Sequence, residues 1–157
     1  MGLQVPVSCG ARGQFVTRQN NIQHNVTGLK SGVRDALDRK DVHNFTKVIS
    51  QGPHGTVHVD SDCDMWDIRV AGYDTLFYLH HSYVDYLWAF WQDLQRLWGQ
   101  SNPSIDGFAP RTFSQSLRLY ETFGHKTPLT IKQSSVMNTT NYVLFDGLTP
   151  AQYLENH

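Results

Sequence analysis

The chain has 157 residues, of which 39% are hydrophobic and 17% charged, and its formal net charge is −1. This composition predicts one globular domain with a sizeable core and argues against a disordered chain or a repeat array. The near-zero charge offers no electrostatic attraction to nucleic acid or to an anionic membrane. Because His80 and His81 interrupt the longest apolar run, no membrane-spanning segment is expected.

Three helices are predicted in the first part of the chain, after an irregular start over residues 1–20. Apolar side chains first recur at helical spacing at Leu29, Val33 and Leu37. A second, short helix is expected from Val42 to Ile49. Gly52 and Pro53 then interrupt the pattern. Pro53 suits the first position of a new helix, since its missing amide hydrogen would be unsatisfied there in any case.

The longest predicted helix runs from Tyr73 to Trp98 and is the most aromatic part of the sequence. Asp74 can cap its start, and Gly99 can end it. One stripe of this helix holds Phe77, His81, Val84, Trp88, Trp91 and Trp98. His81 is therefore expected to face the core, whereas His80 is turned about 100° away.

Beyond Gly99 the periodicity weakens, and Ser, Thr, Pro and Asn become frequent. Residues 100–147 are predicted to be loops that cover the core, within a loop-rich C-terminal part over residues 100–157. Thr149 and Pro150 suit the cap and the first position of one last short helix.

Two histidines of the predicted third helix, His54 and His58, are four residues apart, so both rings project from one face. Since the chain has eight histidines, about 0.4 such pairs are expected by chance, and the pair alone is only a hypothesis. The inward His81 of the next helix strengthens it. Three neutral imidazoles suit Cu, Zn, Fe or Ni. A zinc hydrolase is disfavoured, because no Glu lies near the pair to act as a base.

Three glycosylation acceptor patterns begin at Asn25, Asn44 and Asn138. Three in a chain of this length favour a secreted, extracellular glycoprotein, although the first residues, MGLQVPVSCGARGQF, contain no secretion signal. Cys9 and Cys63 could pair in that compartment, but two cysteines alone do not identify it.

The segments GPHGTVH and DMWDIRVAGYDTLFYLHHSYVDYLWAFWQ resemble the second copper-binding half, the copper-B region, of type 3 copper proteins. These are the tyrosinases, the catechol oxidases and the molluscan hemocyanins. The resemblance covers residues 52–98 firmly and residues 25–51 more weakly. It implies a mainly α fold, in which the helix pair of a type 3 copper four-helix-bundle core is followed by a long irregular C-terminal segment.

The family pattern is a His-x-x-x-His pair, an Asp-Pro-x-Phe stretch, a His-His pair and an Asp-x-x-Trp. Placed on this sequence, it implies that His54, His58 and His81 bind copper and that His80 is a hydrogen-bonding neighbour. Phe77 matches a family aromatic that packs over the copper, and a plain core role is equally consistent with it.

The sequence departs from the family pattern at several positions. Thr75 replaces the usual Pro, and Tyr86 replaces a frequent Arg or Lys, which brings this stretch closer to the hemocyanins. Gly55 stands where many members have Asn or Asp. Asp62 and Cys63 fall where two glycines are common.

A type 3 site also needs a second copper on three more histidines, and this chain lacks a matching set. The histidines left over are His24, His43, His125 and His157. The resemblance therefore implies one partial tyrosinase-type domain over residues 1–157, completed by a missing copper-A half or by a second copy of the chain. An open apolar flank is expected for that partner along Trp88, Trp91 and Trp98.

Three functions stay open for such a copper-binding domain. The first is an oxidoreductase that uses O2 to oxidise phenolic small molecules, of the diphenol oxidase type. The second is a hemocyanin-type oxygen-carrier segment without turnover, and the third is a non-catalytic relic of the fold. Because Gly55 has no side chain to help deprotonate a monophenol, a completed site should favour diphenols.

Overall fold

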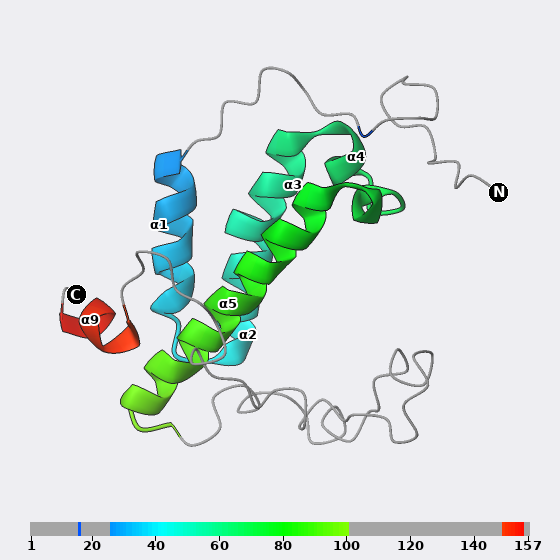
Figure 1. Cartoon of the computed structure of the whole chain (residues 1–157). Helices are drawn as coiled ribbons and strands as arrows, with labels where there is room; N and C mark the ends of the chain where they lie inside the picture. Colours follow the sequence, from blue (N-terminus) through cyan, green and yellow to red (C-terminus); the bar gives the residue numbers. More distant parts are fainter. Residues whose placement is uncertain (1–15, 17–25, 101–148, 156–157) are drawn as a thin grey trace, which may run out of the picture. The chain divides into compact units, whose positions relative to one another are not determined.

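The computed structural model describes residues 16, 26–100 and 149–155, and every regular element among these residues is a helix (Figure 1). The helices are α1 (Val26–Leu37), α2 (Val42–Ile49), η1 (Ser50–His54), α3 (Gly55–Ser61), α4 (Cys63–Trp66), η2 (Ala71–Tyr73), α5 (Thr75–Leu97) and α9 (Pro150–Glu155). Within the described residues, no helix is both long enough and apolar enough to span a membrane. The mainly α prediction is confirmed for this part of the chain.

The predicted helix ends agree closely with the structure. Helix α2 has the predicted bounds, and α5 begins where the Asp74 carboxylate accepts the Leu76 amide N–H at 2.8 Å. Gly99 follows α5 with a φ of +89°, the left-handed conformation in which helices commonly end. At α9, the Thr149 hydroxyl accepts the Gln152 amide N–H at 3.2 Å, and the Gln152 side chain accepts the Thr149 amide N–H in return. Residues 101–147, predicted as loops, lie outside the described residues.

The chain divides into two compact units, Met1–Ala36 with Lys47–Asp85, and Leu37–Thr46 with Tyr86–His157. We call the first the histidine unit and the second the aromatic unit. Helix α5 contributes its first half to the histidine unit and its second half to the aromatic unit.

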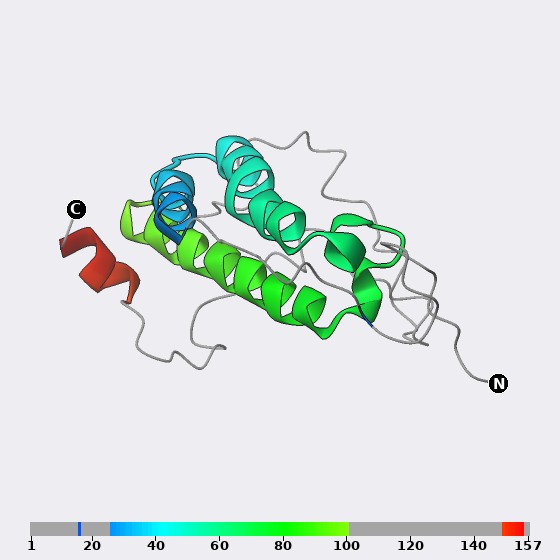
Figure 2. The ribbon, with the colours of Figure 1, turned by 90° about the horizontal axis from the view of Figure 1, so that it is seen from above.

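In the histidine unit, α3 lies beside the first half of α5 (Figures 1 and 2). The element η1 is not one continuous helix, because Gly52 leaves the helical region at φ −94°, ψ −109°. The buried Pro53 follows this kink and opens the helical run into α3, as the sequence predicts. Gly32 of α1 permits close packing here, since a Cβ at that position would lie 3.1 Å from the Pro53 ring.

The aromatic unit is organised around Trp91, which is fully buried. Its ring stacks on Phe45 at a centroid distance of 4.7 Å, and its indole N–H donates to the Arg39 carbonyl at 2.7 Å. Gln95 donates to the same carbonyl at 2.9 Å. The backbone between α1 and α2 is thereby joined to the second half of α5. Helix α9 contacts this unit through Tyr153, whose hydroxyl donates to Asp38 at 3.2 Å.

The predicted open flank along Trp88, Trp91 and Trp98 is wrong for its central member, because Phe45 and Arg39 cover Trp91. Trp88 is half-buried against the edge of Phe45. Trp98 is also half-buried, with the Lys40 ammonium 2.7 Å from its ring centroid. These three tryptophans therefore pack inside the aromatic unit.

Candidate metal centre

Four imidazoles gather in the histidine unit, brought together by α3 and the first half of α5. His54 ends η1 and His58 lies one turn later in α3, whereas His80 and His81 are neighbours in α5. The six centroid distances among the four rings run from 4.8 Å for His54–His58 to 5.6 Å for His80–His81. All three predicted ligands, His54, His58 and His81, are thus found together.

His58 is oriented by a backbone group that the sequence did not reveal. Its Nδ1 lies 2.7 Å from the Met65 carbonyl oxygen, and because a carbonyl only accepts, Nδ1 must carry the proton. A neutral His58 then has its lone pair on Nε2. Metal-binding histidines usually donate their second ring nitrogen in this way, which fixes both tautomer and ring orientation.

The Nε2 of His58 lies within hydrogen-bond distance of His81, with 3.4 Å between the two Nε2 atoms. Two imidazole nitrogens that bind one ion tetrahedrally at about 2.0–2.1 Å lie about 3.3–3.4 Å apart. The observed separation therefore fits two ligands of one metal ion.

His80 has a different set of contacts. Its Nε2 donates to the His54 carbonyl at 3.1 Å, and its ring stacks on the His54 ring at 5.3 Å with an interplanar angle of 11°. One nitrogen from each of His54, His58 and His80 also lies within 4.8 Å of the others. Since Nε2 of His80 is engaged, only its Nδ1 could bind a metal.

The expectation that His80 turns away from the core is wrong. His80 is only 8% exposed and is more buried than His81, because it packs against His54, the last residue of η1. Helical periodicity assigns each residue to a face of α5. It does not predict how much of the helix surface the neighbouring segment covers.

Phe77 packs against the cluster, with its ring centroid 4.2 Å from that of His81 and 6.0 Å from that of His58. It lies one turn before His81 on α5, as the sequence predicts. An apolar ring at this position removes water from one side of the imidazoles and restricts how His81 can turn.

Burial lowers the basicity of three of the rings. It is the main reason that the pKa of His54 and the pKa of His81 lie below their usual value, with neighbouring imidazoles adding to the effect. For His80, burial lowers the pKa to about 4 despite the opposing hydrogen bond to the His54 carbonyl. These histidines are therefore neutral at pH 7, the form that binds a metal without releasing a proton.

Outside this cluster, the remaining histidines provide no second site in the described part of the chain. His43 is exposed on α2 and belongs to the aromatic unit. His24, His125 and His157 lie outside the described residues. Cys63 is disulfide-bonded, and Cys9, the other cysteine of the sequence, also lies outside the described residues.

Comparison with known proteins identifies the family. Residues 7–94, more than half of the chain, match the model described as the common central domain of tyrosinase. The chain belongs to the tyrosinase family. This places it among the type 3 copper proteins, as the sequence motifs predict.

Several curated proteins are similar to this tyrosinase-family chain. It is 33% identical over 84 residues to Hemocyanin A-type, units Ode to Odg, of Enteroctopus dofleini, covering 49% of the chain and 7% of that protein. It is 28% identical over 139 residues to Hemocyanin 1 of Megathura crenulata, covering 80% and 4%. Tyrosinase HcTyr1 of Hahella sp. (strain CCB-MM4) is 28% identical over 91 residues, covering 58% and 18%. The chain spans less than a fifth of each of these relatives, and no solved structure matches it significantly.

The cofactor follows from family and geometry together. The tyrosinase family binds copper, and the histidine cluster fits a copper site, because neutral imidazole is a preferred copper ligand. Within the described part of the chain no thiolate competes for this role, since its one cysteine, Cys63, is disulfide-bonded.

We predict that the metal-free protein loses stability as the pH falls from about 6.5 to about 4. The pKa of His80 is about 4 in the folded chain, below the usual histidine value of about 6.5, so in this window the unfolded chain binds a proton that the folded chain does not. This contribution is fully present above pH 6.5 and is lost towards pH 4, by about 3 kcal/mol at most. Urea unfolding at a series of pH values measures it.

His80→Gln is the matched control for this effect. Its amide N–H can still donate to the His54 carbonyl, but it does not titrate, so the stability of this variant should depend less on pH over the same window. Identical pH profiles for the two proteins would contradict the assignment of the effect to His80.

Proposed function

We propose that residues 52–98 form the copper-B half of a type 3 copper site, with one copper bound by His54, His58 and His81. The observation that carries the proposal is the 3.4 Å separation between the Nε2 atoms of His58 and His81, with His58 Nδ1 already engaged by the Met65 carbonyl. Two helices thus bring one Nε2 atom each to one point, and His54 lies one turn before His58 on the same face.

His80 acts in this proposal as a neighbour that positions His54 and does not bind the metal. Its Nε2 is already engaged by the His54 carbonyl, and its ring lies flat against that of His54. To bind the metal, His80 would have to coordinate it through Nδ1 while its Nε2 keeps the hydrogen bond to the His54 carbonyl. His81 would only have to coordinate the metal.

We further propose that the completed domain oxidises diphenols with O2. Copper supplies the electron-transfer chemistry, and the protein residues hold it, exclude water and orient the substrate. In the described residues, Phe77 and the buried side of the imidazole cluster provide the water-free wall. A single copper cannot deliver two electrons to O2, so activity requires a second copper half.

The partner in this proposal is a copper-A half, and a second copy of the chain is the alternative. Large apolar side chains are exposed throughout the histidine unit, which is unusual for a surface that faces only water. Among the described residues of this unit they are Val16, Val59, Trp66, Ile68, Tyr73, Tyr78, Leu79 and Tyr83. This exposed set replaces the tryptophan flank as the surface that a partner would cover. Residues 1–157 would then be one partial domain.

Diphenols are favoured over monophenols because of Gly55. A Cβ at this position would lie 2.9 Å from the Ser50 carbonyl oxygen, so even Ala would force the backbone at the kink to shift. An Asn beside the first copper ligand, as the resemblance describes for many members, is therefore incompatible with this backbone. The site has no side chain at this position to help deprotonate a monophenol.

Oxygen carriage without turnover is the second candidate function. The observation in its favour is that Hemocyanin, units G and H, of Sepia officinalis matches the chain at 38% identity over 68 residues, above the 34% over 70 residues of Tyrosinase P of Aspergillus terreus. Both functions need the same copper ligands, so the first test addresses the ligands and the second separates the two functions.

We predict that replacing a ligand by Gln weakens copper binding by about 100-fold or more, because each ligand contributes one bond to the metal and Gln is a poor substitute. The ligand variants are His54→Gln, His58→Gln and His81→Gln. Equilibrium titration with copper against a competing chelator measures the affinity.

His80→Gln and the exposed His43→Ala are the controls, and both should stay within about tenfold of the unaltered chain. An equal loss in His80→Gln and His81→Gln would show that the ligand assignment is wrong.

We predict that the copper-loaded chain alone consumes little O2 with either a catechol or tyrosine. Adding a copper-A fragment from a tyrosinase-family relative should raise catechol-dependent O2 uptake by about tenfold or more. Reversible O2 binding without turnover in the mixture would favour the carrier. Robust tyrosine hydroxylation by the isolated monomer would contradict the half-site proposal.

We also propose that the protein is secreted and glycosylated. Asn44 is exposed near the start of α2, as an acceptor must be, while Asn25 and Asn138 lie outside the described residues. Expression in a secretory host should add a glycan that an endoglycosidase removes. Asn44→Gln should reduce the mass by one glycan, and an unmodified protein from that host would contradict the proposal.

A further inference from the structure

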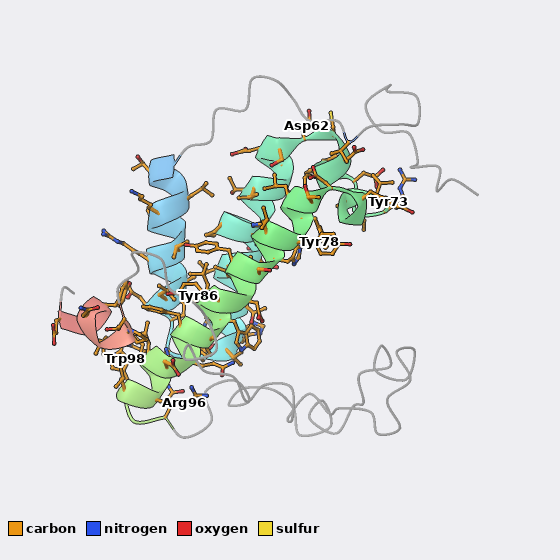
Figure 3. The ribbon with its side chains drawn as sticks, viewed as in Figure 1. Asp62, Tyr73, Tyr78, Tyr86, Arg96 and Trp98 are labelled. Atoms are coloured by element: carbon orange, nitrogen blue, oxygen red, sulfur yellow. The ribbon has the colours of Figure 1, made fainter. Side chains whose placement is uncertain are left out.

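A strained turn separates α3 from α4. Asp62 has φ 51°, ψ −170°, and Cys63 has φ 49°. They are the only non-glycine residues with positive φ in the described part of the chain. The Asp62 conformation lies close to a region that only glycine adopts readily, so the surrounding structure must hold it in place. Figure 3 shows Asp62 at the end of α3.

This turn folds the chain back towards His58. The Asp62 amide N–H donates to the Val59 carbonyl at 3.1 Å, and the Met65 amide N–H donates to the Asp62 carbonyl at 3.1 Å. The Met65 carbonyl, seven residues after His58, thereby reaches the Nδ1 of that ring at 2.7 Å. The hydrogen bond between His58 and Met65 therefore links the segment before the turn to the segment after it.

The hydrogen bond also satisfies the backbone of α4. The last carbonyls of any helix lack partners inside it, and α4 is a single turn of four residues. The Met65 carbonyl is one of these groups, and His58 supplies its donor. If the turn opened, both the buried Met65 backbone and the His58 ring would lose a partner.

Buried neighbours hold the turn on both sides. Ser61 and Met65 are fully buried, and Asp64 is 2% exposed. Cys63 is buried and disulfide-bonded. These contacts explain how two residues other than glycine can keep positive φ values.

We propose that the Asp62–Cys63 turn is a positioning element of the copper site, which fixes the tautomer and the ring plane of His58 through the Met65 carbonyl. The inference rests on the proposed role of His58 as a ligand. It assigns a role to the two positions at which the family commonly has glycines. This role requires the positive-φ backbone conformation. Asp62 and Cys63 adopt it here because their buried neighbours and the disulfide hold them in it.

The first test is the tautomer of His58 in the metal-free protein, measured by two-bond ¹H–¹⁵N correlation NMR of the ring and assigned with His58→Gln. We expect a single Nδ1–H tautomer. An Nε2–H tautomer, or rapid averaging of both, would overturn the inference without any reference to copper. Absence of copper binding with a fixed Nδ1–H tautomer would instead remove the proposed function and leave the orientation of His58 standing.

The second test compares Asp62→Gly with Asp62→Val. Glycine adopts the turn conformation freely, so Asp62→Gly should keep the tautomer and bind copper with a Kd within about twofold of the unaltered chain. A β-branched residue resists positive φ, so Asp62→Val should lose the single tautomer and weaken the copper Kd by about 10- to 100-fold. An unchanged tautomer and Kd in folded Asp62→Val would overturn the inference.

If Asp62→Val does not fold, Cys63→Gly and Cys63→Ala replace it. Both lack the disulfide and differ in their tolerance of positive φ. We expect Cys63→Gly to retain more of the Nδ1–H tautomer and bind copper more tightly than Cys63→Ala. Equal behaviour of these two variants would overturn the inference.

Discussion

The hydrogen bond from His80 to the His54 carbonyl joins the two chain segments that build the histidine cluster. Buried polar groups are costly when they lack partners, so this bond limits how α3 and α5 can pack. With His80 bound to the backbone of His54, the neighbouring His81 lies 3.4 Å from His58 between their Nε2 atoms. The geometry of the metal centre therefore depends on a histidine that we do not assign as a ligand.

Backbone groups do the rest of the positioning. The kink at Gly52 redirects the chain before His54, and the turn at Asp62 redirects it after His58. The short helical segment between them carries both histidines, and a carbonyl beyond the second turn returns to the His58 ring. A site built in this way relies on local backbone conformation, and side chains such as Phe77 close it from the α5 side.

Much of this arrangement was predictable from the sequence, because residues close together in the chain determine where these helices begin and which faces they bury. Helical periodicity located α2 and α5, and Pro53, Asp74 and Thr149 marked helix starts through their own chemistry. The convergence of His54, His58 and His81 followed from a resemblance to a known family and from the spacing of the histidines on their helices. Their assignment as the copper ligands stays a prediction.

Other features depended on contacts between distant residues, which periodicity does not contain. Trp91 is buried because Phe45 and the Arg39 carbonyl, far away in the sequence, cover its ring and its N–H group. His80 is buried because its ring stacks on His54 and its Nε2 donates to the His54 carbonyl, 26 residues earlier in the chain. The Met65 carbonyl had no sequence signal of its own, since every residue has a carbonyl.

The two departures from the family pattern beside the histidines have one physical basis. At Gly55 the backbone lies too close to the Ser50 carbonyl for any side chain, and at Asp62 and Cys63 it adopts a conformation that favours glycine. In both places the structure near a histidine tolerates only one backbone conformation, and that conformation limits which side chains fit. At Gly55 a side chain would force the backbone to shift, whereas at Asp62 and Cys63 buried neighbours and a disulfide compensate for side chains that the conformation disfavours. The stretch from Gly52 to Met65 therefore holds the histidines through backbone conformation, and its side chains are free to vary only as far as that conformation permits.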